Sequence, residues 1–265
     1  MALNMSQIAD VVPERFALSP QLEPILHMQN YHLKPEAEYA LQHCPRTYVN
    51  IPQKVHHWHL WVDGSFFPGK NTRAGWSVVV QAQITPNSDG PYELVYVLAG
   101  PVTETEVSFF KAMHQGSELS EAIAVHEAVK WGITQAEPFT VHYDSKTAGQ
   151  AAESTALAAQ NIEQITNATK GLVELACTRG QAVDFRHVKS HEGCPLNELA
   201  DNFAKHAANG HCNTGAAFHL HQTWYEQDSE VASWAWLARA TPTQRKKRGL
   251  PEQPGTQITF PPPQG

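Results

Sequence analysis

Three apolar segments follow one another in the middle of the chain, and each alternates in hydrophobicity as a sheet strand does. They cover residues 55–63 (VHHWHLWVD), 75–84 (GWSVVVQAQI) and 92–99 (YELVYVLA), and β-branched and aromatic side chains are frequent in each. The links between them contain Gly, Pro, Asn and Asp, which favour turns. Successive strands with short links predict an antiparallel meander, and this limits how the rest of the chain can join the sheet.

Helical and strand patterns alternate after the meander. The predicted order β-β-β-α-β-α-α-β-α gives an α/β fold, a mixed five-stranded sheet in which the meander is followed by parallel strands and helices cover both faces. The expected strands are residues 139–144 and 182–188, and the expected helices are residues 117–132, about 145–152, about 156–178, and 196–208.

The two ends of the chain differ from this region. Prolines recur through residues 1–54, which predicts a weakly structured leader. Residues 55–210 are expected to form one domain. Residues 211–265 are expected to be an extension, in which residues 222–240 are compatible with one helix before a Pro- and Gly-rich linker.

Composition narrows the class of protein. The chain has 265 residues, of which 42% are hydrophobic, so it can build a sizeable core. It has no apolar stretch of the roughly 20 residues that span a membrane, and no apolar run at its start that would act as a secretion signal. Four distant cysteines argue against disulfides and a Cys-rich zinc site. We therefore expect an intracellular protein, in the cytoplasm or nucleus, with no membrane contact.

Four acids stand where predicted elements meet. Asp63 ends the first predicted strand and Asp144 the fourth, Glu118 opens the first helix, and Asp201 lies in the last. Where strands one and four are neighbours, these side chains gather at one sheet edge. Gathered carboxylates repel one another unless cations lie between them, and oxygen ligands suit Mg²⁺ or Mn²⁺. Two such ions about 4 Å apart are the usual means of hydrolysing a phosphodiester, and the net charge of −7 fits such an acidic site.

Each of these residues also has an ordinary structural explanation. An Asp before Gly is commonly a turn residue, and a Glu in a first helical turn stabilises the helix dipole. Asp144 precedes Ser-Lys-Thr and would cap the next helix. His57 and His59 share a strand face with Asp63, which leaves a histidine metal site open beside a packing role.

In order and context these segments resemble the type 1 ribonuclease H family. The resemblance covers about residues 55–209 and is carried by WVDGSF, GSELSEAIAVHEAV, VHYDSKTAG and RHVKSHEGCPLNELADNFAK. The family pattern has Asp-Gly-Ser on the first strand, Glu-Leu on a helix and Asp-Ser at a strand end. Its last and most specific motif is matched by His191, Gly193, Asn197 and Asp201.

The resemblance implies a catalytic set and a cofactor. Asp63 would bridge two Mg²⁺ ions, with Mn²⁺ as a substitute, and Glu118, Asp144 and Asp201 would complete the metal ligands. His191, in a loop beside glycine, would move protons or help product leave. One ion would activate water and the other would stabilise the leaving 3′-oxygen, giving 5′-phosphate and 3′-hydroxyl ends.

The resemblance also implies the substrate, the RNA strand of an RNA–DNA hybrid, which the enzyme distinguishes by the 2′-hydroxyl. Ordinary turn or capping chemistry explains the candidate contacts about as well. They are Gly64, Ser65, Gln115, Ser145, Thr147 and Asn197.

Family members that bind hybrids strongly often carry a basic protrusion containing Trp, and this chain departs from that pattern. Residues 151–179 hold Lys170 and Arg179 as their only basic residues and lack Trp. Residues 55–210 contain 10 Lys and Arg against 17 Asp and Glu, so we expect weak hybrid binding that salt abolishes quickly. Residues 191–205 are especially similar to the ribonuclease H domains of non-LTR retroelements. A reverse transcriptase domain in the same polyprotein is therefore an expected partner.

Two other functions compete with an active ribonuclease H. One is a catalytically silent module that keeps the fold for binding or structure, and the other is a different nuclease or integrase-type enzyme. A silent copy would usually have lost an acid, whereas all four acids and His191 are present.

Overall fold

The computed structural model describes residues 35, 55–86, 92–104, 107, 112–190 and 194–211. The predicted helix at 222–240 and the proposed proton-transfer residue His191 lie outside the described residues. None of the described helices is long and apolar enough to cross a membrane.

In the described part of the chain, a mixed five-stranded sheet forms the centre of the fold, as predicted, and its strands lie in the order β3-β2-β1-β4-β5. The first three strands are antiparallel, and β4 and β5 run parallel to β1. The strands are β1 (His57–Phe67), β2 (Arg73–Gln83), β3 (Tyr92–Pro101), β4 (Phe139–Tyr143) and β5 (Val183–His187).

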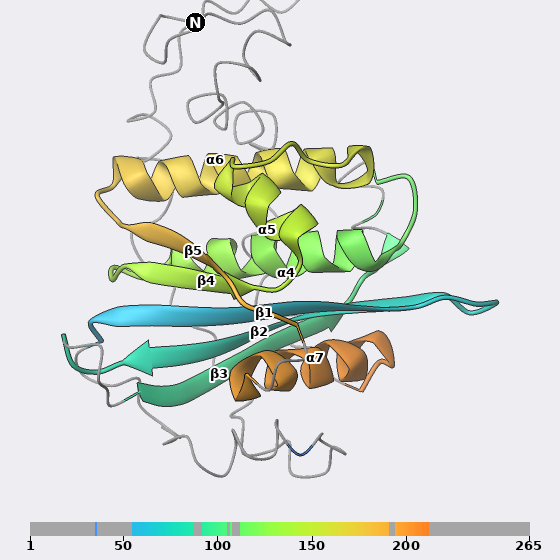
Figure 1. Cartoon of the computed structure of the whole chain (residues 1–265), viewed down its shortest axis with the longest axis horizontal. Coiled ribbons are helices and arrows are strands. Elements are labelled where there is room, and N and C mark those ends of the chain that lie inside the picture. The colour runs from blue at the N-terminus through green and yellow to red at the C-terminus, as the bar shows by residue number, and fades with distance from the viewer. Residues whose placement is uncertain are drawn as a thin grey trace, which may run out of the picture.

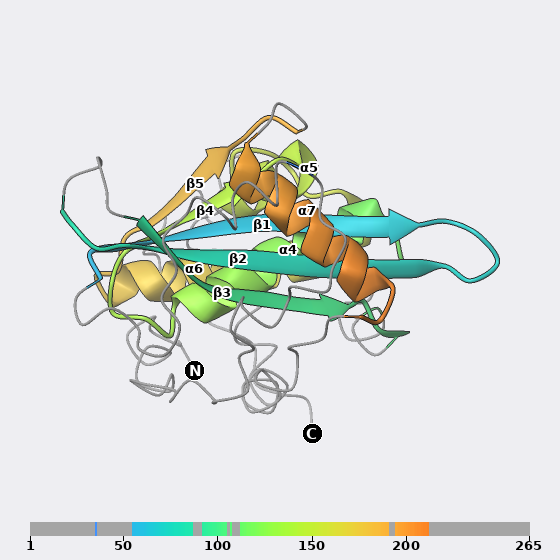
Figure 2. The ribbon, with the colours of Figure 1, turned by 90° about the horizontal axis from the view of Figure 1, so that it is seen from below.

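Helices cover both faces of this sheet. Among the described helices, Figure 1 shows α4, α5 and α6 on one side and α7 on the other, and Figure 2 shows α7 crossing the antiparallel strands. The helices are α4 (Ser117–Gly132), α5 (Lys146–Glu153), α6 (Glu163–Thr178) and α7 (Pro195–Ala208), with a short 3-10 turn η2 (Gln160–Ile162) before α6.

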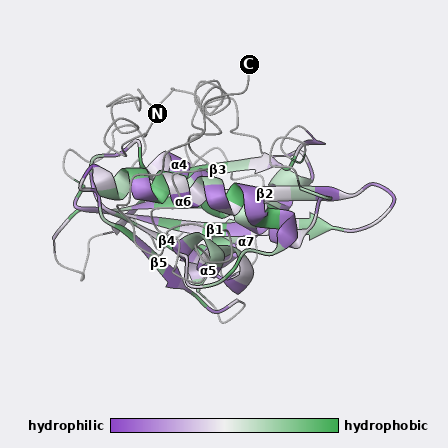
Figure 3. Ribbon diagram, turned by 90° about the horizontal axis from the view of Figure 1, so that it is seen from above, coloured by the Kyte–Doolittle hydropathy of each residue, from purple (hydrophilic) through white to green (hydrophobic). Residues whose placement is uncertain are grey.

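The core has two layers because the side chains of β1 alternate between the two faces. Trp58, Leu60 and Val62 pack with α4 and α6 in the larger cluster, where Trp58 meets Trp131 edge to face at 5.1 Å between ring centroids. The smaller cluster joins β2 and β3 to α7, through Phe203 among others. Along α6, hydrophobic and hydrophilic residues alternate, as Figure 3 shows.

Most predicted bounds agree with the structure to within two residues, but the expected helix at 156–178 begins later. Residues 160–162 form η2, and α6 starts only at Glu163. The side-chain oxygen of Asn161 accepts hydrogen bonds from the backbone N–H groups of Met113 and His114, at 2.8 and 3.3 Å. This tertiary contact holds the segment in a tighter turn than a continuous helix would allow.

The first strand is also longer than predicted. The sequence predicts that this strand ends at Asp63, yet Gly64 and Ser65 pair with Trp76 and Gly75 of β2, and β1 continues to Phe67. Asp63 therefore lies within a strand and not at its end. Glycine at position 64 serves a close contact instead, because a Cβ there would lie 2.3 Å from the backbone nitrogen of Glu121 in α4.

Candidate active site

The site lies where the fourth strand ends beside the first. β4 pairs with β1 only between Trp58 and Trp61, and Asp144 follows directly after β4. Beyond Trp61, β1 continues in partnership with β2 alone. Asp63 therefore lies at a position where no described strand pairs with one edge of β1, and side chains from the end of β4 and from α4 can reach it.

Three carboxylates meet at this position. Asp63, Glu121 and Asp144 each offer an oxygen, and these oxygens lie within 4.8 Å of one another. Among the residues that the structure describes, this is the only such group of His, Cys, Asp or Glu side chains. Asp63 is buried, with 6% of its surface exposed, and its Oδ1 accepts a hydrogen bond from the backbone N–H of Gly64 at 2.7 Å.

The electrostatics of the group are unfavourable without a cation. Burial raises the pKa of Asp63 well above its usual range, and the nearby charges of Asp144 and Asp201 raise it further. Burial likewise raises the pKa of Glu121, as do the charges of Asp63 and Asp144 and a hydrogen bond with Asp63. Protons or cations must therefore relieve the repulsion between these acids.

The helix acid in this group is not the one that the sequence indicated. Glu118 lies in the first turn of α4 with its side chain exposed to solvent, and it is not a member of the carboxylate group. Glu121, one turn further on, takes that place. The close approach of α4 to Gly64 occurs at Ser120 and Glu121, so this part of the helix, and not its first two residues, lies over the acid of β1.

A signal for Glu121 was present in the sequence. Residues at three, four and seven positions after it, Ala124, Val125 and Ala128, are all buried against the sheet. Glu121 stands at the head of that stripe at helical spacing. The Glu-Leu pattern of the resemblance instead selected Glu118, which is followed by a buried Leu119.

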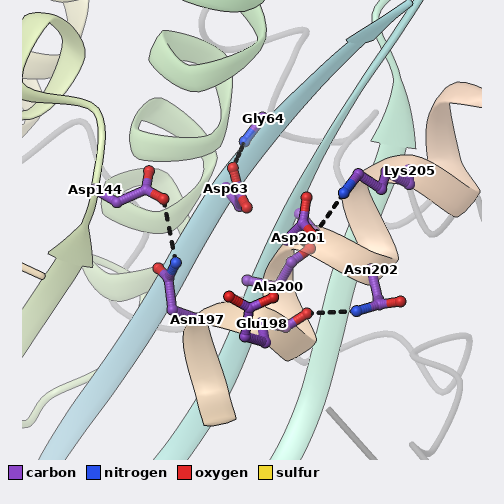
Figure 4. Close-up of polar contacts among 10 residues, drawn as sticks. Asp63, Gly64, Asp144, Asn197, Glu198, Ala200, Asp201, Asn202 and Lys205 are labelled. Atoms are coloured by element: carbon purple, nitrogen blue, oxygen red, sulfur yellow. Dashed lines mark hydrogen bonds and ion pairs between the residues drawn. The ribbon is translucent and has the colours of Figure 1, made fainter. Parts of the chain in front are cut away.

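The fourth acid comes from the opposite face of the sheet. Ser77, the β2 partner of Asp63, donates its hydroxyl to the backbone carbonyl of Ala200 at 2.7 Å and so holds α7 beside the site. Asp201 follows in α7, is 7% exposed, and is near enough to raise the pKa of Asp63. Its Oδ2 forms an ion pair with Lys205 Nζ at 2.7 Å. In Figure 4, Asp63 lies between Asp144 and Asp201.

Asn197 points at this group and not at solvent. Its Nδ2 donates to Asp144 Oδ2 at 3.1 Å (Figure 4), and the side chain is 3% exposed. Its Oδ1 is buried and has no hydrogen-bond partner within the described part of the chain. A buried acceptor without a donor is costly, so this oxygen is suited to a water or hydroxyl in the site.

The other residues proposed as substrate contacts lie around this centre. Ser65 is buried in β1. Gln115 donates from Nε2 to the carbonyl of Val102 at 3.1 Å. Ser145 caps α5 by accepting from the backbone of Ala148, and Thr147 is exposed in the first turn of α5. Their contact with substrate stays a prediction.

The histidines of β1 form a separate cluster. His59 Nδ1 lies 3.0 Å from His142 Nε2, and His57 Nε2 lies 2.7 Å from the Thr140 hydroxyl. His142 also stacks on Trp61 with ring centroids 3.9 Å apart. These imidazoles satisfy one another and their neighbours, which supports the packing role and not the alternative of a histidine metal site.

The donor set of the acidic group fits a hard divalent cation. It consists of carboxylate oxygens only, with a buried amide oxygen beside them, and Mg²⁺ and Mn²⁺ prefer such ligands. The acids come from β1, α4, the end of β4, and α7. They can therefore act together only in the folded chain.

A protein-family model described as RNase H matches residues 56–209, whereas no curated protein matches the chain.

The solution structure of the prototype foamy virus RNase H domain is similar at 16% identity and a TM-score of 0.43, over 58% of this chain and 94% of that one. The foamy viral protease-reverse transcriptase with an RNA/DNA hybrid is similar at 14% identity and a TM-score of 0.43, over 63% of this chain and 23% of that one. LC11-RNase H1 from compost, with an RNA/DNA hybrid, is similar at 14% identity and a TM-score of 0.41, over 58% of this chain and 97% of that one.

Proposed function

The chain belongs to the RNase H family, and from this we propose that it hydrolyses the RNA strand of RNA–DNA hybrids, leaving 5′-phosphate and 3′-hydroxyl ends. The observation that carries the proposal is the meeting of Asp63, Glu121 and Asp144 within 4.8 Å, with Asp201 beside them. Four acids at one position suit hydrolysis of a phosphodiester assisted by divalent metal.

Two ions, Mg²⁺ with Mn²⁺ as a substitute, are the proposed cofactors. When bound, they supply an activated water and stabilise the leaving oxygen. Asp63, at the centre of the four acids, would hold these ions together with Glu121, Asp144 and Asp201. The Gly64 backbone N–H orients Asp63, and Asn197 orients Asp144. Such supporting hydrogen bonds hold ligands in position.

Recognition of the hybrid is proposed for residues bordering the acids. Gly64 and Ser65 of β1 are candidates for reading the 2′-hydroxyl, together with Gln115. Ser145 and Thr147, at the start of α5, are candidates for backbone contacts. His191 is proposed to move protons or to assist product release.

The setting of the domain is also a proposal. Residues 55–210 carry 10 basic against 17 acidic side chains, so the domain has few groups with which to hold a phosphate backbone. A reverse transcriptase domain in the same retroelement polyprotein, within the cell, would supply the missing contacts. This setting predicts weak binding by the isolated chain.

The test is cleavage of a hybrid with labelled RNA at low salt in Mg²⁺ or Mn²⁺, beside single-stranded RNA and duplex DNA. We expect metal-dependent cutting of the hybrid's RNA strand alone. Asp144→Asn and Glu121→Gln should each lower the rate by about a thousandfold or more. Glu118→Gln, the matched change one turn earlier in α4, should cut at the rate of the original protein.

The alternative function is a silent module that binds hybrids without cutting them. It would be favoured if the folded protein bound the hybrid in both metals and produced no cleavage. Equal loss of activity in Glu118→Gln and Glu121→Gln would instead contradict the assignment of the helix acid.

A further inference from the structure

The four acids of the proposed site are not equivalent. Asp63, Glu121 and Asp144 form the compact group, and Asp201 is not a member of it. Asp201 does influence Asp63 electrostatically, so the two carboxylates are neighbours. The site therefore has a preformed part with three carboxylates and a second part that Asp201 and Asp63 can form together.

In the second part, the Asp201 carboxylate is already paired with a positively charged side chain of the protein. Lys205 lies one helical turn after Asp201, and its Nζ approaches Asp201 Oδ2 at 2.7 Å. The Asp201 side chain is 10% exposed and the Lys205 side chain 39%, so the ammonium reaches inward from the rim of the site to a largely buried carboxylate. In Figure 4, Lys205 lies on the side of Asp201 away from Asp63.

We propose that Lys205 is an internal counter-ion that competes with one of the two metal ions, so that the ions bind with unequal affinity. The inference rests on the proposed function of the site. The first ion binds to Asp63, Glu121 and Asp144. The second ion needs Asp201, and its binding is opposed by the lysine ammonium that is paired with that carboxylate.

The physical basis is repulsion between like charges. A divalent ion ligated by Asp201 would lie near the positive ammonium that the same carboxylate attracts. Coulomb's law for a single and a double charge about 6 Å apart in a water-like dielectric corresponds to about a tenfold change in affinity. The lysine stem is flexible and its head is near solvent, so the ammonium can swing out without disturbing α7.

The test measures metal binding in the absence of nucleic acid. Mn²⁺ is titrated into the full chain, with free Mn²⁺ followed by electron paramagnetic resonance and heat by calorimetry. Lys205→Met removes the charge and keeps most of the stem, whereas Lys205→Arg keeps the charge. We expect Lys205→Met to bind the weaker ion about tenfold more tightly, with the stronger ion unchanged, and Lys205→Arg to match the original protein.

A second pair of variants separates this role from a general effect of charge. In an Asp201→Asn background, Lys205→Met should cause no further change, because the competed carboxylate is gone. Equal Mn²⁺ binding isotherms for the original protein and Lys205→Met would overturn the inference. It would also be overturned if Lys205→Met raised the Mn²⁺ affinity equally in the Asp201→Asn background. If no Mn²⁺ binds at all, the proposed metal-dependent function falls too. If ions bind and the hybrid is cut while the isotherms stay equal, only the role of Lys205 is lost.

Discussion

Gly64 combines three tasks in one residue. It continues β1, it donates its backbone N–H to Asp63, and its missing side chain lets α4 approach. The approach brings Glu121 to the acid of β1. A glycine after Asp suggests a turn, but in the structure Gly64 allows α4 to contact β1.

Substitution of Gly64 should therefore damage both fold and site. In Gly64→Ala the new Cβ would lie 2.3 Å from Glu121 backbone nitrogen, so α4 must move away. We expect a loss of about 1–3 kcal/mol in unfolding free energy and weaker Mn²⁺ binding. Gly116→Ala is the control, because its Cβ would meet only His114 side-chain atoms at 3.6 Å or more. Chemical denaturation and Mn²⁺ titration check both effects, and equal behaviour of the two variants would contradict the contact.

Asn197 is expected to act by holding Asp144. Asn197→Ala removes the 3.1 Å hydrogen bond, so the cleavage rate should fall about 10–100-fold. Asn202→Ala is a matched control in the same helix, because Asn202 is similarly buried and donates to the α7 backbone at the carbonyl of Glu198, at 2.7 Å. Steady-state cleavage and thermal unfolding of both variants decide the matter. A similar fall in rate for both would indicate helix destabilisation alone.

At the scale of elements, β1 and β4 are joined by neutral imidazoles as well as by backbone pairing. His59 Nε2 lies 3.3 Å from the Gln83 side-chain oxygen, which accepts, so His59 Nδ1 must accept from His142 Nε2–H. Burial lowers the pKa of His59 to about 4 and that of His142 to about 3. The hydrogen bonds and the burial of this pair therefore favour the neutral form of both imidazoles.

The fold should therefore weaken in acid through this pair. Both pKa values lie below the ordinary value of 6.5, so the unfolded chain takes up protons first as the pH falls. The contribution of the pair begins to decrease as the pH falls through about 6.5 and is reduced by several kcal/mol toward pH 4. Denaturation at pH 7, 6 and 5 should show this loss in the original protein. It should be smaller in the double variant His59→Gln, His142→Gln, in which buried His126 still has a lowered pKa, and equal losses in both proteins would count against the role of the pair.

At the scale of the whole molecule, the site couples stability to metal. Acids from β1, α4, the end of β4 and α7 are brought together, so their repulsion opposes folding and a bound cation relieves it. A ligand that binds only the folded chain stabilises it by mass action. The acidic centre is therefore a cost to the fold that the proposed function explains.

Removing the central charge should reverse these effects. Asp63→Asn keeps the shape of the side chain but removes the charge that faces Glu121, Asp144 and Asp201. We expect this variant to unfold at a higher temperature than the original protein in EDTA, by a few degrees for about 1 kcal/mol, and to gain little from added Mg²⁺. Thermal unfolding with EDTA and with millimolar Mg²⁺ provides the check. A variant less stable than the original protein in EDTA would argue against repulsion at the site.

The sequence by itself determined the elements and three of the four acids. Hydrophobic periodicity is local, so the helices at 117–132 and 196–208 and the parallel strands were predicted with small errors. Asp63, Asp144 and Asp201 stand in motifs whose spacing follows those elements. Once β4 pairs with β1, the acids of these two strands lie together.

The tertiary structure alone decided which glutamate of α4 joins them. Glu118 and Glu121 lie one turn apart on neighbouring parts of the same helix, and periodicity defines the buried face without defining how far the helix slides along the strand. That position depends on the contact between Gly64 and Glu121, which are distant in the sequence. The contact of Asn197 with Asp144 likewise depends on how α7 packs across the sheet, whereas Lys205 and Asp201 lie four positions apart within α7, so their pairing is local. The local sequence pattern determines which face of a helix or strand is buried. Contacts between distant residues determine how far one element is shifted along another.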